Sequence, residues 1–175
     1  MSLRTALFAV AALGFGFFAS PAAILSAHAG GLTTPTGEVI LTITGKIAKA
    51  NAGGAATYDL AMLEALPGRA TETETPWTKG KVKFEGPLGA ALLDQIGASG
   101  TTLKIVALND YAVEVPVEDF RKWPVILATR KDGKPMPVRD KGPIFVIYPF
   151  DLDHALYNEK IFSRSAWQVK SIEVQ

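Results

Sequence analysis

The stretch Thr101–Phe120, TTLKIVALNDYAVEVPVEDF, decides the fold class, because it predicts two strands joined by a tight turn. The residues on both sides of the turn are largely β-branched or apolar, which suits strands. Asn109 and Asp110 tolerate left-handed backbone and therefore supply the turn. Two strands that follow each other without a helix between them argue against a regular alternation of strand and helix.

Other strands are predicted on both sides of this hairpin by alternating or continuous apolar patterns. They are expected at 38–45, 69–75, 81–86, 125–129, 141–151 and 165–174. A second hairpin turn is expected at Asp132–Gly133. The strand at 69–75 alternates threonine and glutamate and has no apolar face, and it is followed by Pro76 and Trp77.

Two short helices are predicted between the strands. The first, at 57–67, has Thr57 or Asp59 as its N-cap and is stopped by Pro67. The second, at 87–98, begins at Pro87 and stops at Gly97. Many short strands with a few short helices predict an α+β protein, rich in mixed or antiparallel sheet.

The N-terminus predicts export. Arg4 precedes the apolar run ALFAVAALGFGFFA, and the small residues of SAHA follow it. This pattern is typical of a cleaved secretory signal peptide, which we assign to Met1–Ala29. A retained membrane anchor is the alternative, but the apolar run is short for a full span of about 20 residues. Residues 30–175 are expected to form a single domain with one core in the periplasm.

Charge and cysteine content exclude several kinds of site. Without Arg4, 17 of the 18 basic residues remain against 17 acidic ones. A balanced charge argues against nucleic acid as a partner, because nucleic-acid binding favours a basic excess. The chain contains no cysteine, so it forms no disulfide and offers no thiolate to a metal or a substrate.

Aromatic residues are concentrated at predicted strand ends and in loops. They are Trp77, Tyr111, Tyr148, Phe150, Tyr157 and Trp167, and Arg130, Arg139 and Arg164 lie close to several of them in the sequence. Aromatic faces with a few fixed polar groups suit a flat, hydrogen-bonding heterocycle. Ordinary packing at the edge of a small core is the alternative interpretation. Asp110 and Tyr111 at the hairpin tip could likewise face a ligand or serve only the turn.

Two other groups of residues give weaker indications of a metal or catalytic site. Asp151, Asp153 and His154 are residue types that bind divalent ions, but their spacing is common in solvated loops. No G-x-S-x-G nucleophile elbow is present, and Ser163 and Ser165 lie at the approach to a strand, so a serine hydrolase is not indicated.

The order of several segments resembles the molybdopterin-binding domain of the sulfite oxidase superfamily. They are YDLAMLEALP, FEGPLGAALLDQIGA, LNDYAVEVPVED, LATRKDGKPMPVRDKGPIFVIYP and WQVKSIEV. The resemblance covers about Glu38 to Val174 and implies the fold of that superfamily. Its catalytic members bind molybdenum through a cysteine between the first two helices. The corresponding interval here, ATETETPWTKGKVKFEGP, has none.

The chain also resembles a group of small exported, cysteine-free proteins, the PruR-like pterin-binding proteins. The shared features are the signal peptide, the length, the Pro-Trp pair after the threonine-rich strand and the terminal RSAWQ. That resemblance implies a periplasmic, non-catalytic protein that binds a reduced pterin or a molybdopterin-like molecule, with molybdenum not expected. It also implies a partner, the periplasmic domain of an inner-membrane cyclic di-GMP cyclase or phosphodiesterase.

Pterin chemistry suggests roles for the candidate residues. A carboxylate can accept from the ring N–H and the exocyclic amine of a pterin together, and Asp110 is the candidate. Arg164 or Arg130 could donate to the neighbouring carbonyl oxygen, while Trp77 and Tyr111 could stack on the ring. The candidate set is Trp77, Asn109, Asp110, Tyr111, Arg130, Arg164 and Trp167. We expect loss of the Trp77 side chain to weaken binding without unfolding the protein.

Two other functions stay open. One is a molybdopterin-dependent oxidoreductase with an atypical, cysteine-free site. The other is an interaction module whose site is degenerate and holds no ligand.

Overall fold

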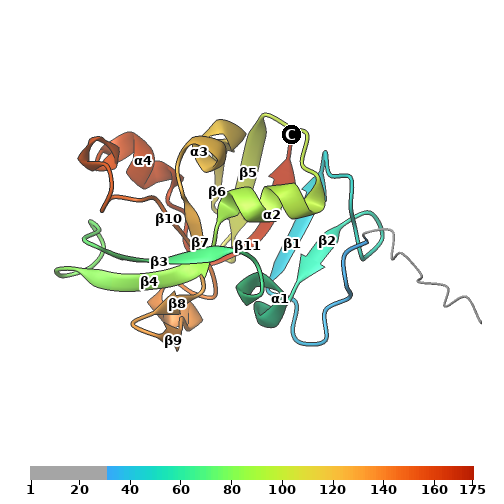
Figure 1. Ribbon diagram of the computed structural model, residues 1–175, viewed down its shortest axis with the longest axis horizontal. Coiled ribbons are helices and arrows are strands. Elements are labelled where there is room, and N and C mark those ends of the chain that lie inside the picture. Colours follow the sequence, from blue (N-terminus) through green and yellow to red (C-terminus); the bar gives the residue numbers. More distant parts are fainter. Residues whose placement is uncertain (1–30) are drawn as a thin grey trace, which may run out of the picture.

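The computed structural model describes residues 31–175, and its largest element is a mixed five-stranded sheet (Figure 1). In spatial order its strands are β2 (Ala56–Tyr58), β1 (Leu41–Gly45), β11 (Val169–Val174), β5 (Thr102–Ala107) and β6 (Ala112–Pro116). The first and last strands in sequence, β1 and β11, pair in parallel, and the other neighbours are antiparallel. The predicted hairpin is β5–β6, and Asp110 at its turn has a φ of 64°.

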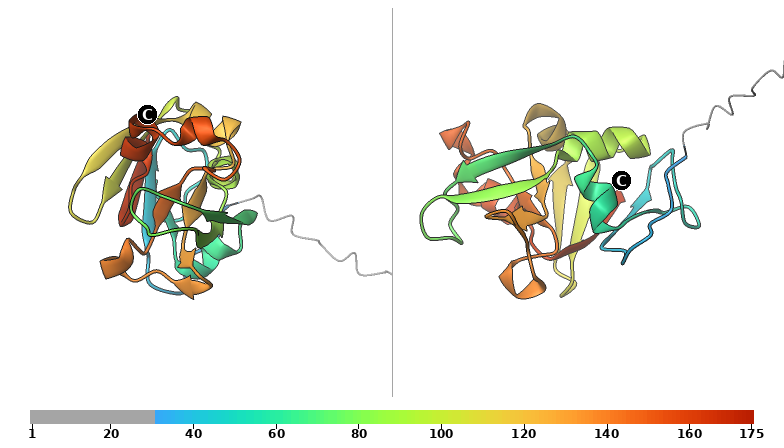
Figure 2. Two further views of the ribbon diagram at one scale, coloured as in Figure 1. Left: turned by 90° about the vertical axis from the view of Figure 1, so that its left-hand side faces the viewer. Right: turned by 60° about the horizontal axis from the view of Figure 1, so that its bottom comes forward.

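A second, four-stranded antiparallel sheet projects from the first (Figures 1 and 2). It contains β3 (Gly68–Thr73), β4 (Val82–Pro87), β8 (Arg130–Lys131) and β9 (Lys134–Pro135). A two-stranded pair, β7 (Ile126–Ala128) with β10 (Phe145–Ile147), has every residue buried.

The threonine–glutamate strand β3 has a buried face made of threonine. Thr71, Thr73 and Thr75 are buried, whereas Glu72 and Glu74 are exposed. Two of the hydroxyl groups find partners: that of Thr73 donates to the Glu74 carbonyl at 3.2 Å, and that of Thr75 pairs with Thr78 at 2.9 Å. The alternation is therefore a half-buried strand whose inner face is polar.

Within residues 31–175, four short α-helices accompany the sheets. They are α1 (Leu60–Glu64), α2 (Gly89–Ile96), α3 (Val117–Lys122) and α4 (Glu159–Arg164). Two turns of 3₁₀-helix, η1 (Val138–Asp140) and η2 (His154–Leu156), complete the regular elements. In α1 the N-cap is Asp59, whose carboxylate accepts from the Met62 amide at 2.8 Å. Gly97 ends α2 in the left-handed conformation, as predicted.

The main core lies between the five-stranded sheet, α2 and the β7–β10 pair. Its members come from β1 to β11, and they include Ile43, Leu92, Leu103, Val146 and Ile172. A smaller cluster under the four-stranded sheet contains Phe84, Met136 and Phe145, with Trp77 packed at its edge. The strand-rich α+β class predicted from the sequence is confirmed.

Two local predictions were wrong. Pro87 closes β4 instead of starting α2, because Gly68–Pro87 pairing extends the strand to that residue. The second strand of the hairpin ends at Pro116 and not at Phe120, since α3 begins directly after this proline with Glu118 and Asp119 in its first turn.

A helix that was not predicted, α4, lies just before the closing strand. Asn158 caps it by accepting from the Ile161 amide at 3.1 Å. The predicted signal peptide, Met1–Ala29, lies outside the described residues. Within residues 31–175, no helix has the length and apolar character needed to span a bilayer.

Candidate functional site

A cavity of about 410 Å³ opens between the β3–β4 loop, the β5–β6 turn and α4. Its lining residues are Trp77, Ala107, Asn109, Tyr111, Glu159, Phe162, Ser163, Ser165, Ala166 and Trp167. Its volume lies in the range of small-molecule sites. Four of the seven residues predicted from the sequence, Trp77, Asn109, Tyr111 and Trp167, therefore meet at one cavity.

Trp77 is the centre of the aromatic wall. Its ring contacts three others edge to face, with centroid distances of 5.5 Å to Phe145, 5.6 Å to Trp167 and 5.8 Å to Phe162. Its amide donates to the Thr75 hydroxyl at 3.3 Å, which fixes the loop after Pro76. Since each such ring pair adds about 0.5–1.5 kcal/mol beyond buried area, removal of Trp77 is expected to cost stability as well as any binding.

Trp167 and Tyr111 present more of their surface. The Trp167 side chain is 37% exposed and that of Tyr111 is 52% exposed. The Lys141 ammonium lies 5.2 Å from the Trp167 ring centroid, which favours one orientation of the indole. Gln168, which follows, has a φ of 53° and donates to the Lys141 and Val138 carbonyls, so the backbone beside Trp167 is held as well.

The tip of the β5–β6 hairpin supplies the polar edge of the cavity. The side-chain oxygen Oδ1 of Asn109 accepts from the Tyr111 backbone amide at 3.2 Å. This contact leaves the two N–H donors of the Asn109 side chain available. Tyr111 is placed by its own carbonyl oxygen, which accepts from the Ala107 amide at 2.9 Å.

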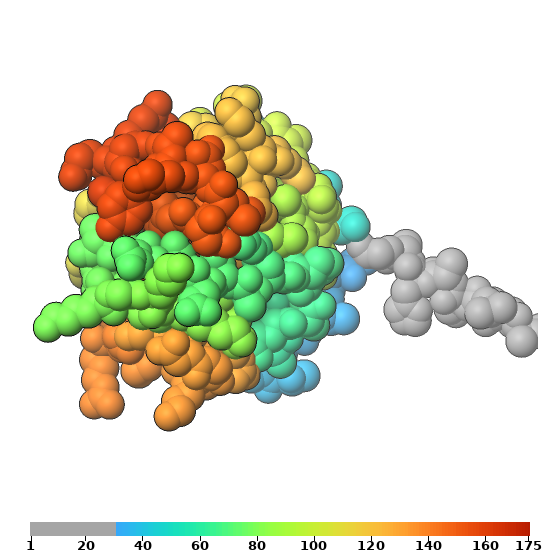
Figure 3. Space-filling model, turned by 60° about the vertical axis from the view of Figure 1, so that its left-hand side comes forward, coloured from blue at the N-terminus to red at the C-terminus, as the bar shows by residue number. Residues whose placement is uncertain are grey.

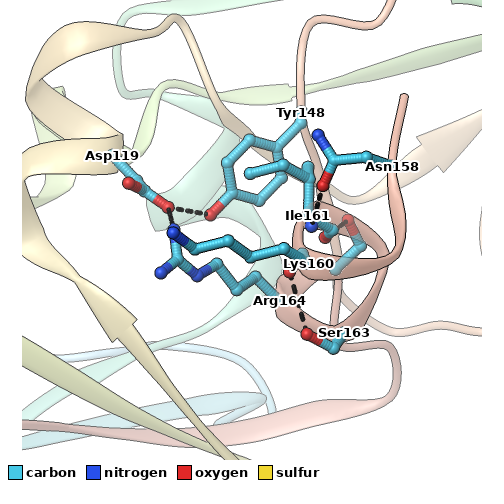
Figure 4. A network of polar contacts seen from close by, with 8 residues as sticks. Asp119, Tyr148, Asn158, Lys160, Ile161, Ser163 and Arg164 are labelled. Atoms are coloured by element: carbon cyan, nitrogen blue, oxygen red, sulfur yellow. Dashed lines mark hydrogen bonds and ion pairs between the residues drawn. The ribbon is translucent and has the colours of Figure 1, made fainter. Parts of the chain in front are cut away.

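The remaining wall is α4, and a buried polar network holds it in place (Figure 4). Arg164 donates to the Asp119 carboxylate of α3 at 2.7 Å, and the Tyr148 hydroxyl donates to the same oxygen at 2.7 Å. Burial, and then the hydrogen bond to Asp119, raises the pKa of Tyr148 well above its ordinary value, so this hydroxyl stays a donor. Asp119 is 6% exposed, which makes this the most buried of the ion pairs among the described residues.

Asp110, Arg130 and Arg164 do not line the cavity, because each is paired elsewhere. The Asp110 carboxylate accepts from Lys170 at 2.6 Å, and this contact lowers its pKa. Arg130 forms a two-point contact with Glu64, at 2.7 and 3.0 Å, which raises the pKa of the guanidinium. Arg164 belongs to the network around Asp119.

Several cavity residues were not among the predicted set. They are Ala107, Glu159, Phe162, Ser163, Ser165 and Ala166. Most belong to or follow α4, so the missed helix explains the omission. The signal in the sequence was Asn158 followed by Glu159, an N-cap and an acidic first-turn residue. Ser163 and Ser165 donate to the Lys160 and Ile161 carbonyls at 2.8 and 2.9 Å.

In the acidic loop around His154, two carboxylates have contacts within the protein. Asp151 is paired with Arg69 at 2.6 Å, and Asp153 caps η2 by accepting from the Ala155 amide at 2.9 Å. Residues 31–175 contain no group of three potential metal ligands. Figure 3 shows instead that the segment at 150–165 lies against the β3–β4 ribbon, where the Arg69–Asp151 pair joins the two.

Comparison of the chain with protein-family models and with curated protein sequences returned no match.

Proposed function

We propose that this chain is an exported, non-catalytic pterin-binding protein with the fold of the sulfite oxidase molybdopterin domain. In this proposal it modulates a membrane-bound cyclic di-GMP enzyme through that enzyme's periplasmic domain. The resemblance of the sequence motifs supports the fold and the partner.

One observation carries the binding part of the proposal. Trp77, Tyr111, Phe162 and Trp167 line a single cavity that also contains the free donors of Asn109. A flat bicyclic ring offers two apolar faces and a polar edge. Aromatic walls contact the faces, and a few fixed polar groups contact the edge.

The residues at this cavity do not fit a phosphorylated molybdenum cofactor. The whole chain lacks cysteine, so no thiolate is available to ligate the metal. Among the ten lining residues the one charged side chain is Glu159, which would repel a phosphate. The donor set therefore favours an unphosphorylated ring system.

The test combines ligand identification with a variant. The exported protein is purified, its small molecules are extracted, and pterin fluorescence and molybdenum content are measured on the same sample. We expect a pterin without stoichiometric molybdenum. Stoichiometric molybdenum would overturn the proposal in favour of the oxidoreductase, and absence of any ligand or pterin affinity would favour the degenerate module.

Trp167→Ala tests the site itself. Loss of one stacking face is expected to weaken pterin binding about tenfold, which corresponds to about 1.4 kcal/mol. Trp123→Ala is the matched control, because Trp123 packs on Tyr148 and lies outside the cavity. Equal affinity in the two variants would contradict the assignment.

The partner is tested separately. The pterin-loaded protein is expected to bind the purified periplasmic domain of a cyclic di-GMP enzyme from the same organism more tightly than the pterin-free protein does. Equal binding by the two forms would contradict a signalling role for the ligand.

A further inference from the structure

The cavity contains one carboxylate whose role in the fold is limited to its place in the first turn of α4, where a negative charge favours the helix N-terminus. Glu159 is exposed in the first turn of α4, and it forms no ion pair or side-chain hydrogen bond within residues 31–175. Other acidic residues nearby do have such roles. Asp153 caps η2, and Asp119 joins α3 to α4 and to Tyr148, which follows β10.

The position of Glu159 is nevertheless well defined. Its helix is anchored before the residue by Asn158, which accepts from the Ile161 amide at 3.1 Å and donates to the Ala155 carbonyl at 2.7 Å. At the other end it is anchored by the pairing of Arg164 with Asp119. Both ends of a six-residue helix are thus fixed, so the Glu159 backbone has little freedom to move.

Glu159 and Asn109 give the cavity two complementary polar groups. The carboxylate only accepts hydrogen bonds, whereas the free part of the Asn109 amide only donates. The two groups come from different elements, α4 and the β5–β6 turn, and both line the same cavity as the aromatic walls. A ligand that satisfies both presents adjacent N–H donors and a carbonyl acceptor around one flat ring.

We propose that Glu159 is the specificity-determining residue of this cavity and selects 2-amino-4-oxo pteridines. This inference rests on the proposed pterin function. The carboxylate accepts from the ring N–H and the exocyclic amine together, which gives two charge-assisted hydrogen bonds. Asn109 donates to the adjacent 4-oxo oxygen. Glu159 thereby takes the place that the sequence had assigned to Asp110, whose carboxylate accepts from Lys170.

The chemistry predicts which analogue is rejected. In lumazine, the 2,4-dioxo pteridine, an oxygen replaces the exocyclic amine. That oxygen has no proton to donate, so its lone pairs face those of the carboxylate. A site designed around a hydrogen bond rejects an analogue that leaves a polar group unpaired. We expect the wild-type protein to bind pterin at least tenfold more tightly than lumazine.

The experiment is a cycle of two proteins and two ligands. Full-length exported wild type and Glu159→Gln are titrated with pterin and with lumazine, both of which are fluorescent. The glutamine amide can donate to the lumazine oxygen, so we expect the variant to lose the preference, with a ratio below threefold. Glu118→Gln is the matched control, since Glu118 is an exposed first-turn residue of the other six-residue helix, α3, and lies outside the cavity.

Each result bears on the inference. A preference of at least tenfold in wild type and Glu118→Gln that disappears in Glu159→Gln supports it. Retention of both affinity and preference in Glu159→Gln overturns it while leaving the pterin proposal intact. Binding of neither ligand by the wild type overturns the pterin proposal and the inference together. Melting temperatures of the three proteins are compared first, and equal values show that the exposed substitutions leave the fold unchanged.

Discussion

Replacing Asp119 by alanine is predicted to destabilise the protein by about 3–5 kcal/mol, because one carboxylate satisfies two other groups. Tyr148 is fully buried, and without Asp119 its hydroxyl loses its only partner among the described residues. An unsatisfied buried donor costs about 1–3 kcal/mol. Arg164 also loses its partner, although its side chain is 17% exposed and can reach water. Its contribution is therefore less than that of a fully buried charge.

Two comparisons make this magnitude specific to the network. Tyr148→Phe removes one hydroxyl and leaves the Asp119–Arg164 pair, so it is expected to cost about 1–2 kcal/mol. Asp94→Ala breaks the pair with Arg121, which also joins an aspartate to an arginine, but the aspartate side chain is 69% exposed. That change is expected to cost less than about 1 kcal/mol.

Urea unfolding measures the three variants. For a slope of about 2 kcal/mol per molar urea, the Asp119→Ala midpoint is expected to fall by about 2 M relative to wild type. The Tyr148→Phe midpoint is expected to fall by less than 1 M, and Asp94→Ala by less still. An Asp119→Ala midpoint that matches Tyr148→Phe, with unchanged slope, would refute the argument that the carboxylate serves both groups.

Two other predictions concern the scaffold. Gly89→Ala is expected to destabilise the protein by about 1–2 kcal/mol in urea unfolding, although alanine favours helices. The added Cβ would lie 2.2 Å from the ring of buried Phe120. A variant more stable than wild type would contradict this prediction. Hydrogen bonds from the backbone amides of Met62 and Gly37 lower the pKa of Asp59 below its ordinary 3.8. The ionised carboxylate therefore stabilises the folded protein above pH 3.8, and this stabilisation is lost as pH falls through the folded pKa. When the free energy of unfolding is measured at about pH 5 and about pH 2, we expect it to fall less for Asp59→Asn than for wild type. An equal fall in the two proteins would contradict this prediction.

Local sequence signals predicted most of the strands, because those signals act over a few residues. Asn109–Asp110 formed the predicted turn, Asp59 was the N-cap of the two alternatives, Thr57 and Asp59, and Gly97 ended its helix. The order of strands in the sheets could not be derived in the same way. Parallel pairing of β1 with β11 joins the two ends of the described chain, and no local pattern encodes a partner so distant.

The short helices were harder to predict for a related reason. Both α3 and α4 have six residues, which is too few for a helical period to stand out from the surrounding pattern. Their formation depends on contacts made elsewhere in the fold, above all on Asp119 of α3 and Arg164 of α4, which hold each other. Because α4 was not predicted, the cavity residues in it and directly after it were not predicted either.

The same reasoning explains why aromatic residues were placed better than charged ones. An aromatic residue at the end of a strand remains near that end in any arrangement, so Trp77, Tyr111 and Trp167 could meet at one cavity. A charged side chain is long, and its position is decided by the opposite charge that the fold brings near it. Lys170 is 60 residues from Asp110 in the chain, and Glu64 is 66 residues from Arg130.

Ion pairing within the protein also decides whether a charged residue indicates a ligand-binding site. Arg130 and Arg164 are each paired with a carboxylate of the protein, so a ligand that binds through them competes with that partner. The Asp110 side chain is 84% exposed, so its pair with Lys170 is a weak surface contact. Glu159 forms no ion pair with a described residue, so a ligand meets no such competition there. A carboxylate that lines an aromatic cavity therefore predicts ligand recognition better than a charged residue that is close to the aromatics only in sequence.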